Sequence, residues 1–571
     1  MFTSTNSSQN KAIEPEKPCL IETAQGFSVS YKNRLLYSKY SPDRVILGTI
    51  KKLDILPGTL ILALSPVLWL GLASLLEKLP ENCLVLGIET DKELYELARS
   101  QLEKQKSGLS KDFQEKVFLL PLEENDFIVN ILTGERKSSA ITLPASSTFR
   151  RVLLLEMSAG VQFSREKYTL LSNLAQNSVA SFWKNRITLI KLGRLYSRNL
   201  FKNLSRLPQA ADFRSLYHQI DKPIFVFGAG ESLETTIKEV GAELIQKAFV
   251  IAVDAAAPAL KAHGIAIDAV IAVEGQLAIE KAYIGATAKS SLIIADTCSR
   301  PSVLNHSARG FSFFASKYTD ADFLRDLSDK EFFPPLIPPL GSVGLTATYI
   351  ALCLRKNINQ PVFVTGLDFS FSLGRTHAKA TPAHINQLCS SNRFKPIENY
   401  RAAFRGEASK SQGKGNTLVF TDTALVSYAK SFTDFFSGTQ NLFDAGKQGL
   451  YLGLPQIDSE SVKAYFGGFS CKPLNLQDIL KVKDCKAAVK EYLAAEEKAL
   501  NRIKELLMFG KDVESCSSTI EEELSYLISK REYLFLHFPD GYKCNTSDLS
   551  FLKRIRGQLD FFLKDIKLAL H

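Results

Sequence analysis

The stretch Pro223–Val240, PIFVFGAGESLETTIKEV, runs from four apolar residues through a glycine turn into an amphipathic segment. This order is typical of a buried strand followed by a helix. Gly228 and Gly230 can adopt backbone conformations that other residues avoid, and the helix start after them, with the hydroxyl of Ser232, would favour an anion. A dinucleotide fingerprint would need a third glycine where Leu233 stands. The stretch alone fits a phosphate-binding turn and a structural turn equally well.

The same alternation of apolar runs and helical spacers continues through residues 222–460. The runs are PIFVFG (223–228), AFVIAVD (248–254), DAVIAVE (268–274), SLIIAD (291–296), FSFFAS (311–316) and PVFVTGLD (361–368). This pattern predicts an α/β domain with a doubly wound, Rossmann-like parallel sheet. Ligands of such sheets bind beyond the carboxyl ends of the strands, where several of these runs end in Asp, Glu or Gly.

A smaller Rossmann-like α/β unit is predicted over residues 21–160. Its strands are GTLILAL (58–64), NCLVLGIET (82–90), KVFLLPL (116–122) and RRVLLLEM (150–157). The uncharged run Ile55–Leu76 is long enough to span a membrane, but Pro57-Gly58 and Ser65-Pro66 interrupt it, so we predict a βαβ unit and no transmembrane segment. Glu89 ends a strand where nucleotide-binding folds hold a ribose, yet the preceding turn has lost its glycines. We therefore favour a structural or protein-binding role for this unit.

The remaining segments complete the predicted organisation. Residues 1–20 are polar and without an apolar core, which predicts a disordered leader and no signal peptide. We predict a helical connector at 161–221 and a helical domain at 461–571, because both lack strand patterns and the second repeats apolar residues at helical spacing. The content of 45% hydrophobic and 23% charged residues is that of a folded protein.

Charge and cysteine content narrow the class of function. The net charge of +10 is spread along the chain without a basic block, which suits a small anionic substrate better than nucleic acid. Nine scattered cysteines, with no C-x-x-C pair, indicate neither a zinc site nor a disulfide framework. We expect reduced thiols and a cytoplasmic location.

Four further residues extend the predicted site along the sheet. Asp254 and Glu274 end the second and third strands of the larger unit, where carboxylates can hold ribose hydroxyls or Mg²⁺. Gly341 and Ser342 open another helix and could form a second phosphate or carboxylate subsite. The structural alternatives are helix capping by Asp254 and a tight glycine turn at 341–344.

The segment after the last apolar run contains the candidate base. Gly366 and Asp368 end that strand, and Arg375, His377 and Lys379 follow in a polar loop. A histidine beside cations and a strand-end carboxylate is suited to general-base catalysis, although a solvent-exposed histidine is the alternative. The long basic segment 373–416 is predicted to be a cationic lid.

Four ordered motifs resemble a known family. GAGESL (228–233), VDAAAPALKAHGIAIDAVIAVEG (253–275), GSVGLTA (341–347) and GLDFSFSLGRTHA (366–378) resemble the domain shared by Maf (motility-associated factor) flagellin glycosyltransferases and MptE-like 6-hydroxymethylpterin diphosphokinases. An N-terminal α/β domain, this central domain and a C-terminal helical domain match the Maf layout, whereas the pterin kinases lack such flanks. The layout favours the glycosyltransferase.

The resemblance implies transfer of a nonulosonic acid, of the pseudaminic or legionaminic type, from a CMP-activated donor to Ser/Thr of flagellin. It assigns the donor phosphate and carboxylate to residues of the two glycine turns, the nucleotide to Asp254 and Glu274, and the general base to His377 oriented by Asp368. Arg375 and Lys379 would stabilise departing CMP. The donor-turn residues are Gly228, Gly230, Ser232, Gly341, Ser342 and, at the adjoining strand end, Gly366.

Two positions depart from the family pattern. Glu231 stands where the family turn commonly has proline, and Glu274 where the third strand usually ends in Asp. No cofactor is certain from the sequence, and Mg²⁺ is a candidate. Two alternatives stay open: a Mg²⁺-ATP diphosphokinase with Asp254, Glu274 and Asp368 around the metal, and a non-catalytic flagellin-binding or assembly factor.

Overall fold

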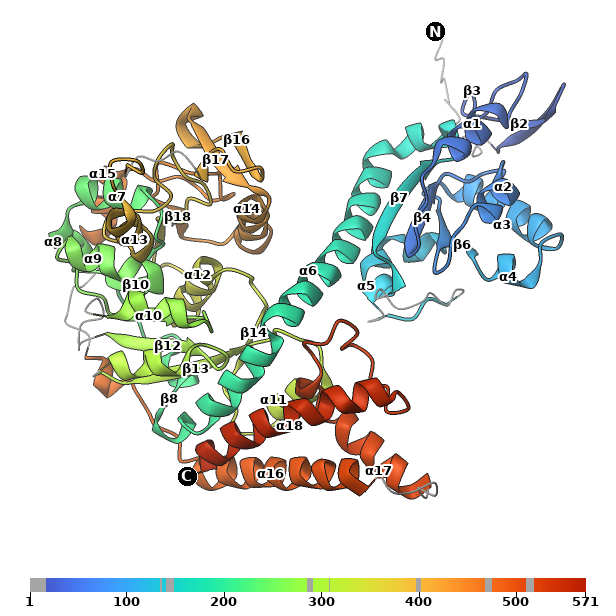
Figure 1. Ribbon diagram of the computed structural model, residues 1–571. Coiled ribbons are helices and arrows are strands. Elements are labelled where there is room, and N and C mark those ends of the chain that lie inside the picture. Colours follow the sequence, from blue (N-terminus) through green and yellow to red (C-terminus); the bar gives the residue numbers. More distant parts are fainter. Residues whose placement is uncertain are drawn as a thin grey trace, which may run out of the picture. The chain divides into compact units, whose positions relative to one another are not determined.

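The structure is a computed structural model that divides into two compact units, residues 1–188 and 189–571, described separately below (Figure 1). It describes residues 17–133, 136–139, 148–284, 291–307, 309–396, 402–467, 475–509 and 518–570. The predicted leader therefore lies outside the described residues except for its last four positions. Helix α6 (Arg165–Leu204) contains the boundary between the units.

The first unit contains the predicted parallel sheet, with strand order β6-β5-β4-β7. Its strands are β4 (Thr59–Leu64), β5 (Leu84–Ile88), β6 (Val117–Leu119) and β7 (Arg151–Glu156). Its helices are α1 (Arg44–Lys52), α2 (Leu72–Glu77), α3 (Lys92–Lys106), α4 (Lys111–Gln114), α5 (Ile128–Thr133) and the first part of α6. An antiparallel sheet of β1 (Cys19–Thr23), β2 (Gly26–Tyr31) and β3 (Arg34–Leu35) was not predicted.

The apolar run at 55–76 forms β4 and the start of α2, which confirms the predicted βαβ unit. Every residue of β4 is buried because both faces of a parallel sheet are covered. Within the described part of the chain, no helix combines the length and the apolar character needed to cross a bilayer.

The second unit is built on a nine-stranded sheet with the order β14-β13-β12-β11-β10-β9-β15-β18, in which β8 also pairs with β13. All of its pairings are parallel. The predicted strands are β9 (Ile224–Phe227), β10 (Phe249–Val253), β11 (Ala269–Ala272), β12 (Leu292–Asp296), β13 (Phe311–Ser316) and β15 (Val362–Thr365). The unpredicted strands are β8 (Ala211–Asp212), β14 (Leu336–Ile337) and β18 (Leu442–Asp444). The chain reverses direction across the sheet between β9 and β15, so this is the topological switch point.

Helices and one hairpin complete the second unit. Its helices are α7 (Ser232–Val240), α8 (Ala242–Ile245), α9 (Ala257–Ala262), α10 (Glu280–Tyr283), α11 (Asp322–Ser328), α12 (Val343–Leu354), α13 (Pro382–Ser390), α14 (Thr423–Phe436), α15 (Ser459–Gly467), α16 (Lys486–Phe509), α17 (Ser518–Ser529) and α18 (Leu549–Leu570). Helix α16 packs against both α17 and α18 (Figure 1). One hydrophobic core includes Val226 of β9 and Leu493 of α16, so the C-terminal helices share the core of the sheet.

Two predicted segments differ in detail. The segment 161–221 was expected to be a helical connector. Within it, Ala211–Asp212 form the short strand β8, which pairs in parallel with β13. The segment 373–416, expected to be a lid loop, contains α13 and strand β16 (Ala408–Gln412), which pairs antiparallel with β17 (Leu418–Asp422).

Candidate functional site at the sheet edge

The glycine turn that ends β9 packs directly against the turn that ends β15. The Gly228 N–H donates to Thr365 O at 2.7 Å, and the Gly230 N–H donates to Gly366 O at 2.8 Å. A side chain at Gly228 would overlap the Gly366 carbonyl, and Gly366 has a φ of +69°, which other residues rarely adopt. The glycines at these three positions are therefore required for the close approach of the two strand ends.

Ser232 and Asp368 form a buried pair at this contact. Oδ2 of Asp368 accepts the Ser232 N–H at 2.9 Å, and Oδ1 accepts the Ser232 hydroxyl. The Ser232 Oγ in turn accepts the Gly366 N–H at 2.8 Å. Burial raises the pKa of Asp368 to about 6, against these hydrogen bonds, which lower it. Asp368 thus caps α7 from a neighbouring strand, where a donor phosphate was predicted.

Glu231 and Glu234 hold the loop after β15. Oε1 of Glu231 accepts the Ser372 hydroxyl at 2.5 Å, and Oε2 lies 3.4 Å from the Arg375 guanidinium. Glu234 lies 3.4 Å from the same guanidinium and accepts the Lys379 N–H at 2.6 Å. The unusual acid of the turn therefore has a cationic partner, and its charge is directed toward the loop that carries the candidate base.

His377 lies within this loop, and its Nδ1 is 3.0 Å from Thr376 Oγ1. Burial lowers the pKa of His377, while the nearby Glu231 carboxylate raises it by a smaller amount. The imidazole is therefore mostly neutral at pH 7, as a general base must be. No hydrogen bond joins the His377 ring to the Asp368 carboxylate, whose two oxygens accept from Ser232.

Asp254 and Glu274 lie at the carboxyl ends of β10 and β11. Asp254 is 3% exposed, and burial raises its pKa to about 7; the Glu274 charge adds to the increase. Its carboxylate accepts the N–H of Ala255 at 2.7 Å. Glu274 is partly exposed and accepts the Gln276 N–H at 2.9 Å. These side chains give the site one buried carboxyl group of raised pKa and one that is partly open to solvent.

The second glycine turn lies before α12. Gly341 has a φ of +72°, and Ser342 caps α12 by accepting the Gly344 N–H at 3.3 Å. A side chain at Gly341 would come within 3.8 Å of the Tyr428 ring. The pKa of Tyr196 is raised mainly by burial, and also by the Glu274 charge and by Tyr428.

A buried ion pair near this edge was not predicted from the sequence. Lys414, expected as a lid cation, is buried, and its Nζ lies 2.6 Å from Asp444 Oδ2; each of these side chains is 2% exposed. The Lys414 charge also lowers the pKa of Asp368. A lysine in a polar, basic segment gives no sign of burial, so only tertiary structure could have identified this pair. Within the described ranges, no group of three or more His, Cys, Asp or Glu side chains is arranged to hold a metal ion.

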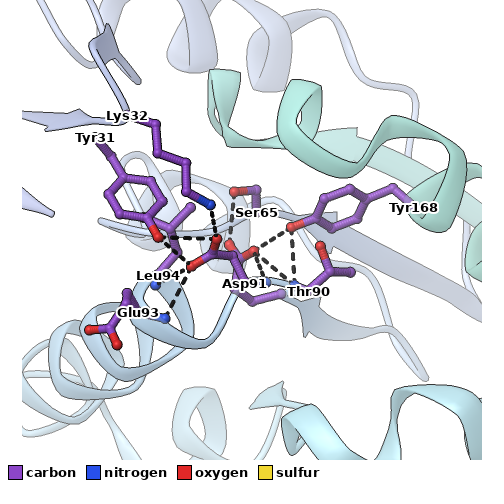
Figure 2. A network of polar contacts seen from close by, with 9 residues as sticks. Tyr31, Lys32, Ser65, Thr90, Asp91, Glu93, Leu94 and Tyr168 are labelled. Atoms are coloured by element: carbon purple, nitrogen blue, oxygen red, sulfur yellow. Dashed lines mark hydrogen bonds and ion pairs between the residues drawn. The ribbon is translucent and has the colours of Figure 1, made fainter. Parts of the chain in front are cut away.

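The corresponding edge of the first unit is filled by its own side chains (Figure 2). Glu89 accepts hydrogen bonds from the Tyr168 hydroxyl at 2.5 Å, the Ser65 hydroxyl at 2.8 Å and the Thr90 N–H at 2.8 Å. Burial raises its pKa. The turn before it holds Trp69, whose ring packs where a side chain on Gly87 would lie. The acid at the ribose position therefore has a structural role in this unit.

Known proteins share this architecture. The family described as 6-hydroxymethylpterin diphosphokinase MptE-like matches residues 197–374. An uncharacterised protein of Treponema pallidum (strain Nichols) is 30% identical over 574 residues, which cover 96% of this chain and 94% of that protein. A solved structure described as a Maf glycosyltransferase from Magnetospirillum magneticum AMB-1 aligns over 97% of this chain and 92% of that one, with a TM-score of 0.50 and 14% identity. The chain therefore contains an MptE-like domain and shares the fold of the Maf glycosyltransferase.

The limits of the MptE-like match are informative. The match begins at Ser197, inside α6, and ends at Gly374, before Arg375 and His377. It therefore includes the second part of a helix that the sequence placed in a connector. At 14% identity, the likeness to the Magnetospirillum protein establishes the fold.

Proposed function

We propose that this protein is a glycosyltransferase of the Maf type that moves a nonulosonic acid, of the pseudaminic or legionaminic type, from a CMP-activated donor to Ser/Thr hydroxyls of flagellin. The solved structure of like fold is described as a glycosyltransferase. The observation that carries the proposal is a partly buried histidine of lowered pKa, in a loop shared with Arg375 and Lys379, next to the switch point of a parallel sheet.

His377 would act as the base. Its neutral imidazole would take the proton of the acceptor hydroxyl as the oxygen bonds to the anomeric carbon of the sugar. The bond from that carbon to the CMP oxygen breaks, and CMP leaves with the electron pair. Arg375 and Lys379 would offset the negative charge that develops on CMP. Since Thr376 lies at Nδ1, Nε2 is the nitrogen available to the acceptor.

The donor would extend along the sheet edge from the α12 turn to the ends of β10 and β11. Gly341 and Ser342 open a helix of twelve residues, whose start favours a phosphate or carboxylate. The other turn contributes less in this proposal, because the N–H groups of Gly228, Gly230 and Ser232 donate to protein oxygens. Asp254 and Glu274 would contact the nucleotide.

Replacing His377 tests the chemical step. We expect His377→Ala to transfer sugar to flagellin about 10²- to 10⁴-fold more slowly than the wild type, measured as the mass increase of intact flagellin with time. His384→Ala is the matched control: His384 lies in the same segment, and its Nδ1 accepts the Ala380 N–H, so its loss should leave the rate within a few fold. Equal rates for wild type and His377→Ala would refute the assignment of the base.

Ligand binding separates this function from its alternatives. The family description that matches residues 197–374 names a diphosphokinase, which would bind ATP and require Mg²⁺. A thermal-shift series with CMP, CMP-N-acetylneuraminic acid and ATP, with and without EDTA, distinguishes the two. We expect stabilisation by the CMP compounds in EDTA. Stabilisation by ATP with Mg²⁺ alone would support the diphosphokinase, and no shift at all would support a non-catalytic role. Flagellin of unchanged mass in cells that lack the protein would remove the proposed function.

A further inference from the structure

One face of α6 lies against the strand ends of the second unit. Tyr196, Asn199 and Asn203 are spaced i, i+3 and i+7 and therefore lie on the same side of the helix. The Asn199 side-chain amide donates to Gly275 O and to Cys298 O, both at 3.1 Å. The Asn203 amide donates to Thr297 O at 2.8 Å and to Ser299 O at 3.0 Å.

These four bonds tie α6 to two neighbouring loops. Gly275 follows β11, and residues 297–299 follow β12. Asn199 bridges the two loops, because one amide group donates to both. Asn199 is 2% exposed and Asn203 is fully buried, so water cannot replace the lost donors easily. The helix thus supplies the donors that the buried loop carbonyls need.

The bridged loops carry the candidate nucleotide contact. Glu274 immediately precedes Gly275, and its carbonyl accepts the Arg300 N–H at 3.0 Å. A side chain at Gly275 would lie 3.1 Å from the Asn199 amide and 3.5 Å from the Tyr196 ring, so helix and loop are in close contact. Tyr196 also stacks edge-on against Tyr318 at a centroid distance of 5.7 Å. Movement of this face of α6 would therefore displace Glu274.

We propose that Asn199 and Asn203 are positioning residues of the donor site, which fix the loops after β11 and β12 and thereby the place of Glu274, and that Tyr196 forms part of the wall of this site. The assignment to a donor rests on the proposed function. The fixing of the loops does not, because it follows from the hydrogen bonds alone.

The test measures loop mobility and ligand affinity separately. Hydrogen–deuterium exchange is followed in the loops 274–279 and 297–302, and the Kd of CMP is measured by calorimetry, for the full chain and Asn199→Ala. We expect exchange in both loops to become about tenfold faster and the Kd to rise about tenfold, since an unsatisfied buried carbonyl costs this order of free energy. Asn199→Ser keeps one hydrogen-bond donor and should give an intermediate exchange rate and an intermediate Kd. It provides the same test if Asn199→Ala fails to fold.

Asn125→Ala is the matched control. Asn125 is fully buried in the first unit and donates to Glu89 O at 2.7 Å. Its substitution therefore removes a comparable buried amide hydrogen bond from the first unit. We expect it to leave exchange in both loops and the Kd of CMP unchanged. Unchanged loop exchange in Asn199→Ala and Asn199→Ser would overturn the positioning role. Faster exchange with an unchanged Kd would overturn the link to the donor. If the wild type binds no CMP while exchange in both loops is faster in Asn199→Ala than in the wild type, the result would support the positioning role and count against the proposed function.

Discussion

At the scale of single residues, the site consists of groups whose chemistry is set by burial. Asp368 was expected to orient the base, and it instead caps α7 through Ser232. Glu231 stands where the family turn commonly has proline, and it pairs with Arg375. Both differences have the same cause: strand ends that meet at a switch point bring polar groups together from distant parts of the chain, and buried polar groups must find partners.

Asp254 provides a pH test at this scale. Burial raises its pKa to about 7, from an ordinary value of 3.8, so the folded state holds a proton that the unfolded state releases. The stability that this proton supplies is present below pH 4 and is lost as the pH rises toward 7. We expect the melting temperature of wild type, relative to Asp254→Asn, to fall between pH 5 and 7 and to level off above. A constant difference from pH 5 to 8 would contradict the raised pKa.

At the scale of elements, the hairpin β16–β17 is fixed to the sheet by an internal ion pair. Lys414 lies between the two strands, and its ammonium group meets Asp444 at the end of β18. The backbone of Lys414 also donates to Gly449 O at 2.9 Å. The predicted lid is therefore anchored at Lys414, beside Asp368, and the positive charge of Lys414 forms an ion pair inside the protein.

Removing this lysine should destabilise the second unit. Lys414→Met leaves Asp444 buried without its partner, which typically costs about 3 to 5 kcal/mol. We expect a lower midpoint of unfolding in urea, and faster hydrogen exchange in β16 and β17. Lys410→Met is the control, because Lys410 is exposed on the same hairpin over the Phe420 ring. Equal midpoints for the two variants would show that the buried pair adds no stability.

At the scale of the whole molecule, the two Rossmann-like sheets differ in the side chains at their strand ends. The first unit fills its strand ends with Glu89, Ser65 and Tyr168, whereas the second presents Asp254, Glu274 and the α12 turn. The two units are separate compact bodies. We therefore expect ligand binding in the second unit to be independent of the network in the first.

Glu89→Gln tests this separation. The amide cannot accept all the hydrogen bonds that Glu89 accepts, so we expect faster hydrogen exchange in β4 and β5, with a loss of about 1 to 3 kcal/mol in the first unit. The Kd of CMP should stay as in the wild type. Glu81→Gln, an exposed change in the same unit, should alter neither quantity. A weaker affinity for CMP in Glu89→Gln would show that the first unit contributes to the site.

The sequence alone predicted the strands that are buried on both faces, because such strands read as continuous apolar runs whatever their partners. It also predicted the C-terminal helices from their spacing, and it brought Asp254, Glu274 and the glycine turns to one edge through the topology of a parallel sheet. It missed β8, β14 and β18, which are two or three residues long and have no pattern of their own.

The remaining features depend on contacts between distant segments. The pairing of Ser232 with Asp368 and the amide bridges of Asn199 and Asn203 join residues between 76 and 136 positions apart. The buried pair of Lys414 and Asp444 also joins two separate segments. No local pattern encodes such bonds, since asparagine, lysine and aspartate look alike in a solvated loop and in a buried cluster. The sequence determined which residues reach the edge of the sheet, and only the tertiary structure decided which of them are used to hold it together, because buried polar groups are satisfied by whatever partners the fold brings near.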